Sequence, residues 1–270
     1  MQDILLLFLT GIFGGFLSGL LGIGGGIIYI LVLPIVLEDM GVPRDHLVQF
    51  TVANSVFGTL MASISGNLTQ IIHKNFFLKD VLLVGSAATI ISLCTLNFIV
   101  YSSWYSMDVF NVTVILILIY MLVSVVKNSK RFKGAVPEER DVVKMGIAGA
   151  SGGLIAALSG LGGGLVVIPL LNIFLKMDIK KAKSISLGVI LISALFMTVS
   201  NLLAEGAASF SFFHIGYIAP SIVLPLGVGV MLAAPYGVLL SKKMTSYTIS
   251  LLFSVFVILV VFKKLYELFN

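Results

Sequence analysis

Charged residues are rare in this sequence. Only 11% of the 270 residues are Asp, Glu, Lys or Arg, whereas 59% are hydrophobic. A soluble domain averages about 25% charged residues, and so few charges cannot cover the water-facing surface that one or two soluble domains of this length need. The composition therefore excludes a soluble protein and predicts a chain whose solvent is the lipid bilayer.

Cysteine and histidine are rarer still. The single cysteine, Cys94, lies in an apolar run, so an intramolecular disulfide is excluded. The three histidines, His46, His73 and His214, lie at the expected membrane edges, and the sequence contains no cluster of metal-ligating residues. We therefore expect neither a metal ion nor a cofactor.

Two short motifs resemble parts of enzyme sites, but both lack the structural setting that they need. Residues 149–153 fit the nucleophile pattern G-x-S-x-G, which requires a preceding strand. Gly22 and Gly24 match part of a dinucleotide-binding pattern, which requires a βαβ unit. Neither setting is predicted here, so we expect no enzyme.

The charged residues gather at the chain ends and in short breaks between apolar runs. An ionised side chain at the bilayer centre costs roughly 2.5–3.5 kcal/mol or more, so we expect none in the membrane interior. The net charge of +5 needs no nucleic-acid partner, because basic cytoplasmic loops produce the same balance. The breaks cover residues 38–46, 70–80, 101–108, 127–144, 176–183, 204–214 and 241–244.

The chain contains an internal duplication. At an offset of 138 residues, six glycines of one segment superpose on six glycines of another, and each segment precedes a charged break and three further apolar runs. The sequence thus predicts a first membrane repeat over 1–127, a cytoplasmic linker over 128–141 and a second membrane repeat over 142–270. The matching glycines are Gly14, Gly15, Gly22, Gly24, Gly25 and Gly26 with Gly152, Gly153, Gly160, Gly162, Gly163 and Gly164.

The first apolar run of each repeat is too long for one span. Residues 2–37 would form a straight helix of roughly 54 Å, against a hydrocarbon core of about 30 Å. Gly22-Ile23-Gly24-Gly25-Gly26 interrupts this run, and glycine permits a non-helical backbone. We therefore expect a broken, re-entrant helix pair here and again over 145–175. Single spans are predicted near 47–72, 78–100, 109–126, 182–203, 212–240 and 247–261, the fifth kinked by its three prolines.

Loop charges orient these spans. The breaks at 70–80, 127–144, 176–183 and 241–244 hold 14 of the 17 Lys and Arg, which places them in the cytoplasm by the positive-inside rule. Three full crossings per repeat follow, so the two repeats have opposite orientation. The predicted fold is an all-α membrane protein with two inverted repeats, each a Gly-broken helix pair plus three transmembrane helices. Lys263 and Lys264 then lie outside, against the rule.

The two glycine-rich turns are candidate binding sites for an anion. Inverted repeats with broken helices are typical of secondary transporters, which hold substrate near the midplane. Unpaired N–H groups and the helix dipole at a helix start favour an anion, and glycines let it approach the backbone. The alternative is close helix packing through GxxxG spacing, which we favour for Gly11 to Gly19 and for Gly149 to Gly153. The candidate glycines are Gly24, Gly25, Gly26, Gly162, Gly163 and Gly164.

Polar residues on two later spans complete the candidate site. Thr51 and Asn54 lie on the span after the first turn, and Ser186 and Asn201 lie on the matching span of the second repeat. Such residues can instead satisfy themselves on the helix backbone or bond between helices. Buried Asn is costly to leave unpaired, so Asn54 and Asn201 are the stronger candidates among ligands of the anion.

The motif Gly-x-Gly-Gly-Gly occurs twice, at Gly22 to Gly26 and at Gly160 to Gly164. With this doubled motif and the duplicated architecture, the chain resembles the sulfite exporter TauE/SafE family of permeases. The resemblance implies a multi-pass protein of the bacterial inner membrane that moves sulfite, a sulfonate or a related organosulfur anion, with export as the expected direction. The second repeat keeps Pro169, where the first has Leu31. This difference bears on the substrate more than on the class.

The remaining alternatives are a passive anion channel and a signalling membrane subunit. A carrier saturates and exchanges its substrate, whereas a channel passes current continuously. The expected partners are a small anionic substrate and the lipid bilayer; a coupling ion, either a proton or sodium, and a homo-oligomer are left open.

Overall fold

The computed structural model describes residues 2–128, 141–204, 210 and 212–269. These residues form ten α-helices and one π-helical segment, with no strand beyond the isolated bridge between Ile215 and Ile218. The all-α prediction is confirmed for this part of the chain. The elements are α1 (Gln2–Leu21), α2 (Gly26–Asp39), α3 (Arg44–Ile72), α4 (Leu78–Thr95), η1 (Leu96–Val100), α5 (Met107–Asn128), α6 (Val142–Ser159), α7 (Gly164–Leu175), α8 (Ile179–Leu203), α9 (Pro220–Lys243) and α10 (Ser246–Phe269).

Each long first run is broken at the predicted glycines. α1 stops at Leu21 and α2 starts at Gly26, while α6 stops at Ser159 and α7 starts at Gly164. The predicted helix starts at Gly26 and Gly164 are therefore confirmed. With 14 and 12 residues, α2 and α7 are roughly 21 and 18 Å long, too short to cross a bilayer.

Six helical segments among the described residues are long and apolar enough to cross a membrane. The chain is thus a multi-pass membrane protein. The six segments are Asp3–Leu21, Arg44–Ile72, Leu78–Val100, Val142–Ser159, Ile179–Leu203 and Pro220–Lys243.

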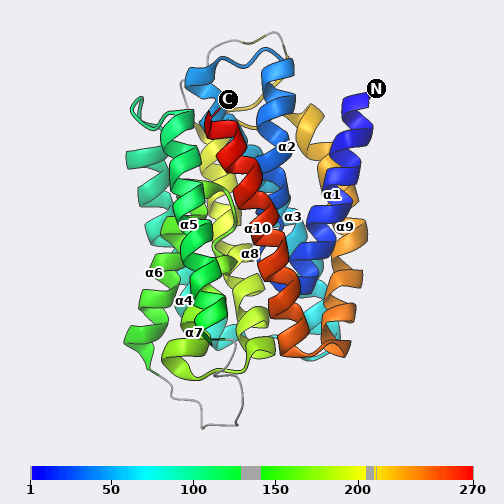
Figure 1. The fold of residues 1–270 in the computed structure, drawn as a ribbon, viewed down its shortest axis with the longest axis vertical. Helices are drawn as coiled ribbons and strands as arrows, with labels where there is room; N and C mark the ends of the chain where they lie inside the picture. The colour runs from blue at the N-terminus through cyan, green and yellow to red at the C-terminus, as the bar shows by residue number, and fades with distance from the viewer. Residues whose placement is uncertain (1, 129–140, 205–209, 211, 270) are drawn as a thin grey trace.

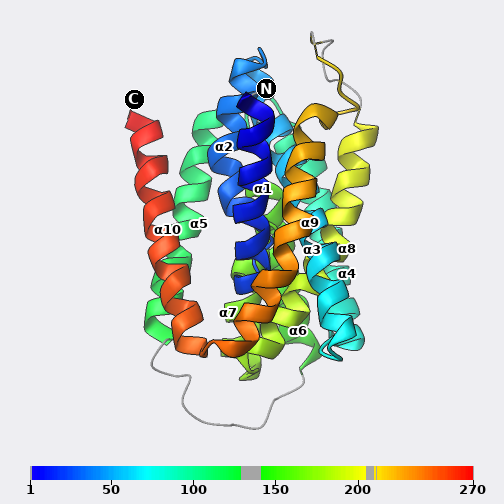
Figure 2. The same ribbon diagram turned by 90° about the vertical axis from the view of Figure 1, so that its right-hand side faces the viewer.

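The helix junctions sort by charge between the two ends of the molecule. In Figures 1 and 2 both termini lie at one end, together with the α2–α3 connection, the end of α8 and the start of α9. The α3–α4, α7–α8 and α9–α10 connections lie at the opposite end, which we call the basic end because it carries the lysine-rich breaks. The pair α1–α2 enters from the end that holds the termini, and the pair α6–α7 enters from the basic end. The inverted-repeat relation itself stays a prediction.

The two repeats interlock through their broken helices. α1 of the first repeat packs along α9 of the second, and α6 of the second packs along α4 of the first. A Cβ atom at Gly11 would lie 2.1 Å from the Leu226 carbonyl oxygen, and one at Gly153 would lie 2.1 Å from that of Ala88. Only glycine permits this approach. The packing interpretation of the GxxxG glycines is therefore confirmed where the helices cross between repeats.

The span predicted over 212–240 starts later than expected. α9 begins at Pro220, because proline lacks the N–H that a helix start leaves unpaired. The residues before it form a tight turn around Gly216, which has a φ of 55°, and the Tyr217 N–H donates to the Asn201 carbonyl. Pro225 and Pro235 lie inside α9 as the sequence indicates.

The predicted linker, 128–141, lies mostly outside the described residues, as does most of the break at 204–214. At the linker's far end, Asp141 caps α6 by accepting hydrogen bonds from the backbone N–H groups of Val143 and Lys144. The backbone hydrogen bond from Lys144, first of all, holds the pKa of Asp141 below its usual value. This cap explains why α6 starts at Val142.

Candidate functional site

The two glycine turns have the same backbone conformation. The φ angles are 77°, 91° and 76° at Gly22, Gly24 and Gly25, and 68°, 88° and 70° at their counterparts Gly160, Gly162 and Gly163. All six lie in the left-handed region, where an L side chain costs about 1–2 kcal/mol. The glycines are therefore required by the backbone at these positions.

The turns contact each other directly. A Cβ atom at Gly26 would lie 2.4 Å from the Gly160 carbonyl oxygen, and one at Gly164 would lie 2.5 Å from the Gly22 carbonyl oxygen. A Cβ atom at Gly162 would lie 3.5 Å from the Gly24 Cα. The structure thus brings the six predicted glycines together, and the two backbones fill the space where they meet.

Several backbone N–H groups in these turns have no acceptor. The N–H groups of Ile23, Gly24 and Gly25 donate to no atom of the described residues, nor do those of Gly162 and Gly163. All five residues are buried. Buried N–H groups are nearly always paired, so these donors are an unused hydrogen-bonding capacity next to the starts of α2 and α7.

The second turn differs at one N–H group. The Leu161 N–H donates to the Ser159 hydroxyl at 3.2 Å, whereas its counterpart, the Ile23 N–H, has no such partner because Leu21 stands at the matching position. The first turn therefore presents three consecutive free donors before α2 begins, and the second presents two before α7 begins.

Each turn is held by a serine of the other repeat. The Ser186 hydroxyl on α8 donates to the Gly22 carbonyl at 3.0 Å, and the Ser55 hydroxyl on α3 donates to the Gly160 carbonyl at 2.8 Å. Ser186 thus lies at the turns as predicted, but its hydroxyl binds the backbone. Ser55 is a contact that sequence reasoning did not select, although it recurs at helical spacing with Thr51 on the same span.

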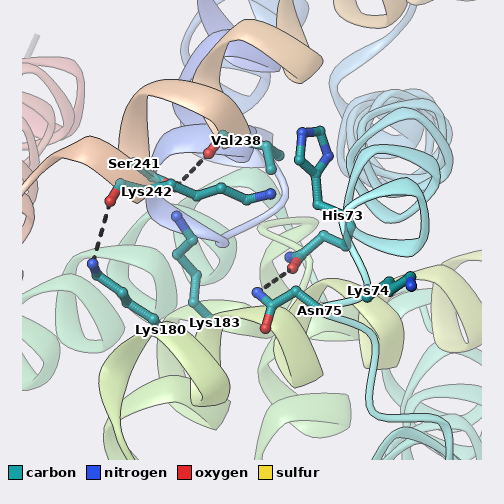
Figure 3. A pocket seen from close by; sticks show the side chains of 9 residues that line it. His73, Lys74, Asn75, Lys180, Lys183, Val238, Ser241 and Lys242 are labelled. Carbon is teal, nitrogen blue, oxygen red and sulfur yellow. Dashed lines mark hydrogen bonds between the residues drawn. The ribbon is translucent and has the colours of Figure 1, made fainter.

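The expectation that no lysine lies in the interior is wrong at Lys183. This side chain is 5% exposed, and its ammonium donates to the Leu20 carbonyl at 2.7 Å, beside the first turn. Figure 3 shows it extending between Lys180 and Lys242. Lys183 was assigned to a polar break, but α8 already starts at Ile179, and the long aliphatic stem carries the charge inward among the helices. Here it meets the negative end of the α1 dipole.

Lys264 is a second buried cation. It is fully buried on α10, where its ammonium donates to the Asn111 amide oxygen at 3.1 Å, and the neighbouring Lys263 donates to the Leu31 carbonyl at 2.7 Å. The two lysines that violated the charge rule therefore bind other helices instead of lying in water at the chain end.

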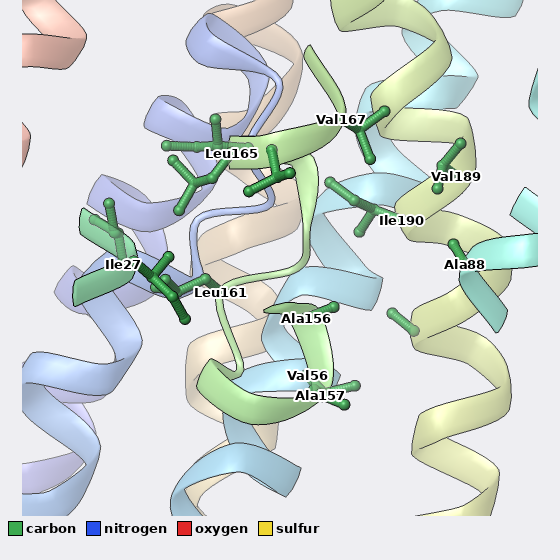
Figure 4. Close-up of a cluster of buried hydrophobic side chains, with 14 of the residues drawn as sticks. Ile27, Val56, Ala88, Ala156, Ala157, Leu161, Leu165, Val167, Val189 and Ile190 are labelled. Atoms are coloured by element: carbon green, nitrogen blue, oxygen red, sulfur yellow. The ribbon is translucent and has the colours of Figure 1, made fainter. Parts of the chain in front are cut away.

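Apolar side chains close the site on its other sides. The Thr59 methyl group and the Ile190 side chain both face Gly24, at 3.3 and 3.4 Å from a Cβ atom built there. Figure 4 shows Ile190 together with Leu161 and Ile27 in the buried apolar cluster around the turns. This low-dielectric surrounding strengthens any hydrogen bond to a charged ligand.

The side chains of the two candidate asparagines form hydrogen bonds with residues outside the glycine turns. The Asn54 amide donates to the carbonyls of Phe50 and Tyr217 and accepts from the Ala219 N–H. The Asn201 amide accepts from the Tyr101 hydroxyl at 3.0 Å. The Asn54 amide thus holds the segment that precedes α9, whereas Asn201 holds it through its backbone carbonyl, which accepts from the Tyr217 N–H. The role of both residues as substrate ligands stays a prediction.

Thr51 is the remaining predicted ligand. It lies one helical turn before Ser55 on α3 and is fully buried. Its hydroxyl has no hydrogen-bond partner among the described residues. Three further hydroxyls among the described residues are also buried without a partner and were not selected from the sequence. They belong to Ser18 on α1, Tyr29 on α2 and Thr198 on α8.

Broken helices that meet at free backbone donors define a membrane transporter of the broken-helix type. The comparison with protein families agrees. The model of the sulfite exporter TauE/SafE family matches residues 6–263, so this chain belongs to that family.

Curated relatives of this chain are also described as membrane transporters. A probable membrane transporter protein of Methanocaldococcus jannaschii is 28% identical over 244 residues, covering 89% of this chain and 87% of the relative. Probable membrane transporter proteins of Haemophilus influenzae and Bacillus subtilis are 27% and 22% identical, each covering at least 95% of both chains. Together with the family match, they identify the chain as a membrane transporter.

Proposed function

We propose that this transporter carries a small sulfur oxyanion or organosulfur anion, such as sulfite or a sulfonate, out of the cell. The observation that carries the proposal is the row of three buried, unpaired N–H groups at Ile23, Gly24 and Gly25, with the Lys183 ammonium beside the same turn. The tetrahedral oxygens of a sulfonate suit several converging donors, and hydrogen bonds to a charged group contribute about 1.5–3 kcal/mol each.

The contact between the two turns supports a carrier over an open channel. Because Gly26 and Gly164 approach the carbonyls of the opposite turn, the anion enters between the turns only when they separate. Such a step exposes the site to one side at a time, as alternating access requires. A proton or sodium ion as the coupling partner belongs to the same proposal.

The position of Lys183 supports export. Lys183 lies near the start of α8 and donates to the Leu20 carbonyl beside the first turn. The α7–α8 connection lies at the basic end of the molecule, which the positive-inside rule assigns to the cytoplasm. A cation on that side of the turns favours loading of the anion from the cytoplasm.

The purified chain in liposomes tests the proposal. Labelled sulfite, sulfoacetate and taurine are each offered with an imposed proton gradient, with a sodium gradient and with neither. We expect saturable movement of at least one anion that is accelerated by the same unlabelled anion on the opposite side. Continuous current without saturation would identify a channel instead, and no movement of any of the three would refute the proposed substrate class.

A further inference from the structure

A basic pocket of about 310 Å³ lies at the basic end of the molecule, between the end of α3, the start of α8 and the end of α9. Four of its nine lining residues are lysines, and none of the nine is acidic; Figure 3 shows them around the opening. The lysines are Lys74, Lys180, Lys183 and Lys242.

The carboxylates nearest in sequence have other partners. Asp80 pairs with Lys181 at 3.8 Å, and Asp178 caps α8 by accepting from the Lys180 N–H. Neither residue lines the pocket. The mutual repulsion of its lysines is therefore not balanced by the residues that line it, and an anion would relieve this repulsion.

Lys183 joins this pocket to the first glycine turn. Its ammonium lines the pocket and also donates to the Leu20 carbonyl, and a Cβ atom at Gly22 would lie 2.1 Å from the Lys183 Cγ. A lysine ammonium has three donor hydrogens. One is used on Leu20, so the others can bind an oxyanion in the pocket.

We propose that this pocket is a second anion site, in which a small oxyanion is held by Lys180, Lys242 and Lys183 before it reaches the glycine turns. The inference deepens the proposed function, because it names the place where the transported anion is loaded. An anion bound to the other donors of Lys183 draws the ammonium toward the pocket and away from the Leu20 carbonyl. Arrival of the anion thus loosens the end of α1 and lets the first turn move away from the second.

Two ligands present the oxyanion group that this pocket would bind, namely a free anion and the phosphate of a lipid headgroup. Lys183 is the deepest cation and is 5% exposed, which favours a small free anion over a headgroup that stays at the bilayer surface. The test therefore compares lipids as well as variants.

Sulfite binding is measured by calorimetry on the full chain in phosphatidylcholine nanodiscs. Lys242→Gln removes a pocket cation, and Lys243→Gln is the matched control, since Lys243 is exposed on the same helix end and does not line the pocket. We expect Lys242→Gln to weaken binding by roughly tenfold or more, as loss of one charged hydrogen bond implies, and Lys243→Gln to change it by less than about twofold. Equal weakening by both variants would overturn the pocket.

Transport of sulfite in liposomes separates this inference from the proposed function. Lys242→Gln should raise the half-saturating sulfite concentration on the basic side and leave the maximal rate unchanged, whereas Lys183→Gln should also lower the maximal rate. Binding without any transport by the wild type would refute the function and keep the pocket. Transport with an unaltered half-saturating sulfite concentration in both variants would refute the pocket and keep the function.

Phosphatidylglycerol nanodiscs provide the lipid comparison. The wild type and Lys243→Gln are measured in both lipids. If the anionic lipid changes the sulfite affinity of the two chains equally, the effect comes from the surface charge of the lipid, and the pocket binds a free anion. The opposite outcome is a loss of sulfite affinity that grows with the phosphatidylglycerol content and occurs only in chains that keep Lys242. This outcome would overturn the proposal in favour of a headgroup site.

Discussion

The first and second glycine turns share one backbone conformation and differ in the side chains packed around them. Lys183 contacts Gly22, whereas the nearest side chain at Gly160 is that of Ser55. Tyr29 packs on Gly14 beside the first turn, and Val167 packs on Gly152 beside the second. The duplication thus preserved the geometry that both halves need, while the first turn gained a lysine beside it.

We infer from this difference that the two turns have different tasks. The second turn has its Leu161 N–H paired by Ser159, so in this proposal it serves chiefly as the surface that closes the first turn. The first turn keeps three free donors and a nearby cation, which is what an anion requires. Three variant pairs and the single variant Asn54→Leu test this division.

The largest effect is expected from valine at the central glycine of each turn. A Cβ atom at Gly25 would lie 2.4 Å from the Gly14 carbonyl oxygen, and one at Gly163 would lie 2.4 Å from the Gly152 carbonyl oxygen. Gly25→Val and Gly163→Val should both abolish sulfite transport while the chain still inserts in the membrane. Liposome uptake with a membrane-insertion control checks this. Wild-type transport by either folded variant would make that turn a packing element only.

A smaller effect should follow from giving the first turn the cap of the second. Leu21→Ser places a hydroxyl where Ser159 binds the Leu161 N–H, and should occupy the free Ile23 N–H. The loss of one charged hydrogen bond should weaken sulfite binding by about 1.5–3 kcal/mol. Leu21→Ala is the control, because it leaves a similar cavity without the hydroxyl. Equal affinities of the two variants in calorimetry would show that the Ile23 N–H does not bind the anion.

Asn54→Leu should affect stability more than transport. It removes the partners of the Tyr217 carbonyl and the Ala219 N–H, and a buried polar group left unpaired costs about 1–3 kcal/mol. We expect a lower unfolding temperature in detergent and a half-saturating sulfite concentration close to that of the wild type. A raised half-saturation at unchanged unfolding temperature would instead make Asn54 a ligand of the anion.

The smallest effect is expected from the two serines that hold the turns. Ser186→Ala and Ser55→Ala each remove one neutral hydrogen bond to a glycine carbonyl, worth about 1 kcal/mol. The two variants should lower the unfolding temperature equally. A clearly greater loss of sulfite affinity for Ser186→Ala than for Ser55→Ala would assign Ser186 a direct contact with the anion at the first turn.

The helices and their breaks could be predicted from the sequence because their causes are local. Long apolar runs require helices in a membrane, and Gly22 to Gly26 and Gly160 to Gly164 end one helix and start another wherever they occur. The start of α9 was missed because the apolar run continues from Phe212 to Pro220, and composition alone does not separate a turn from a helix there.

What the sequence by itself determined is the membrane class, the duplication and the place of the glycine turns, since each depends on neighbouring residues or on their repetition. Only the tertiary structure decided which groups surround the turns. Ser186 and Lys183 contact residues of the first turn region more than 160 positions away in the chain, because the repeats interlock. Such contacts depend on how the helices cross. The sequence places the charge of Lys183 at a membrane edge, but α8 starts four residues earlier, at Ile179, and places this charge among the helices.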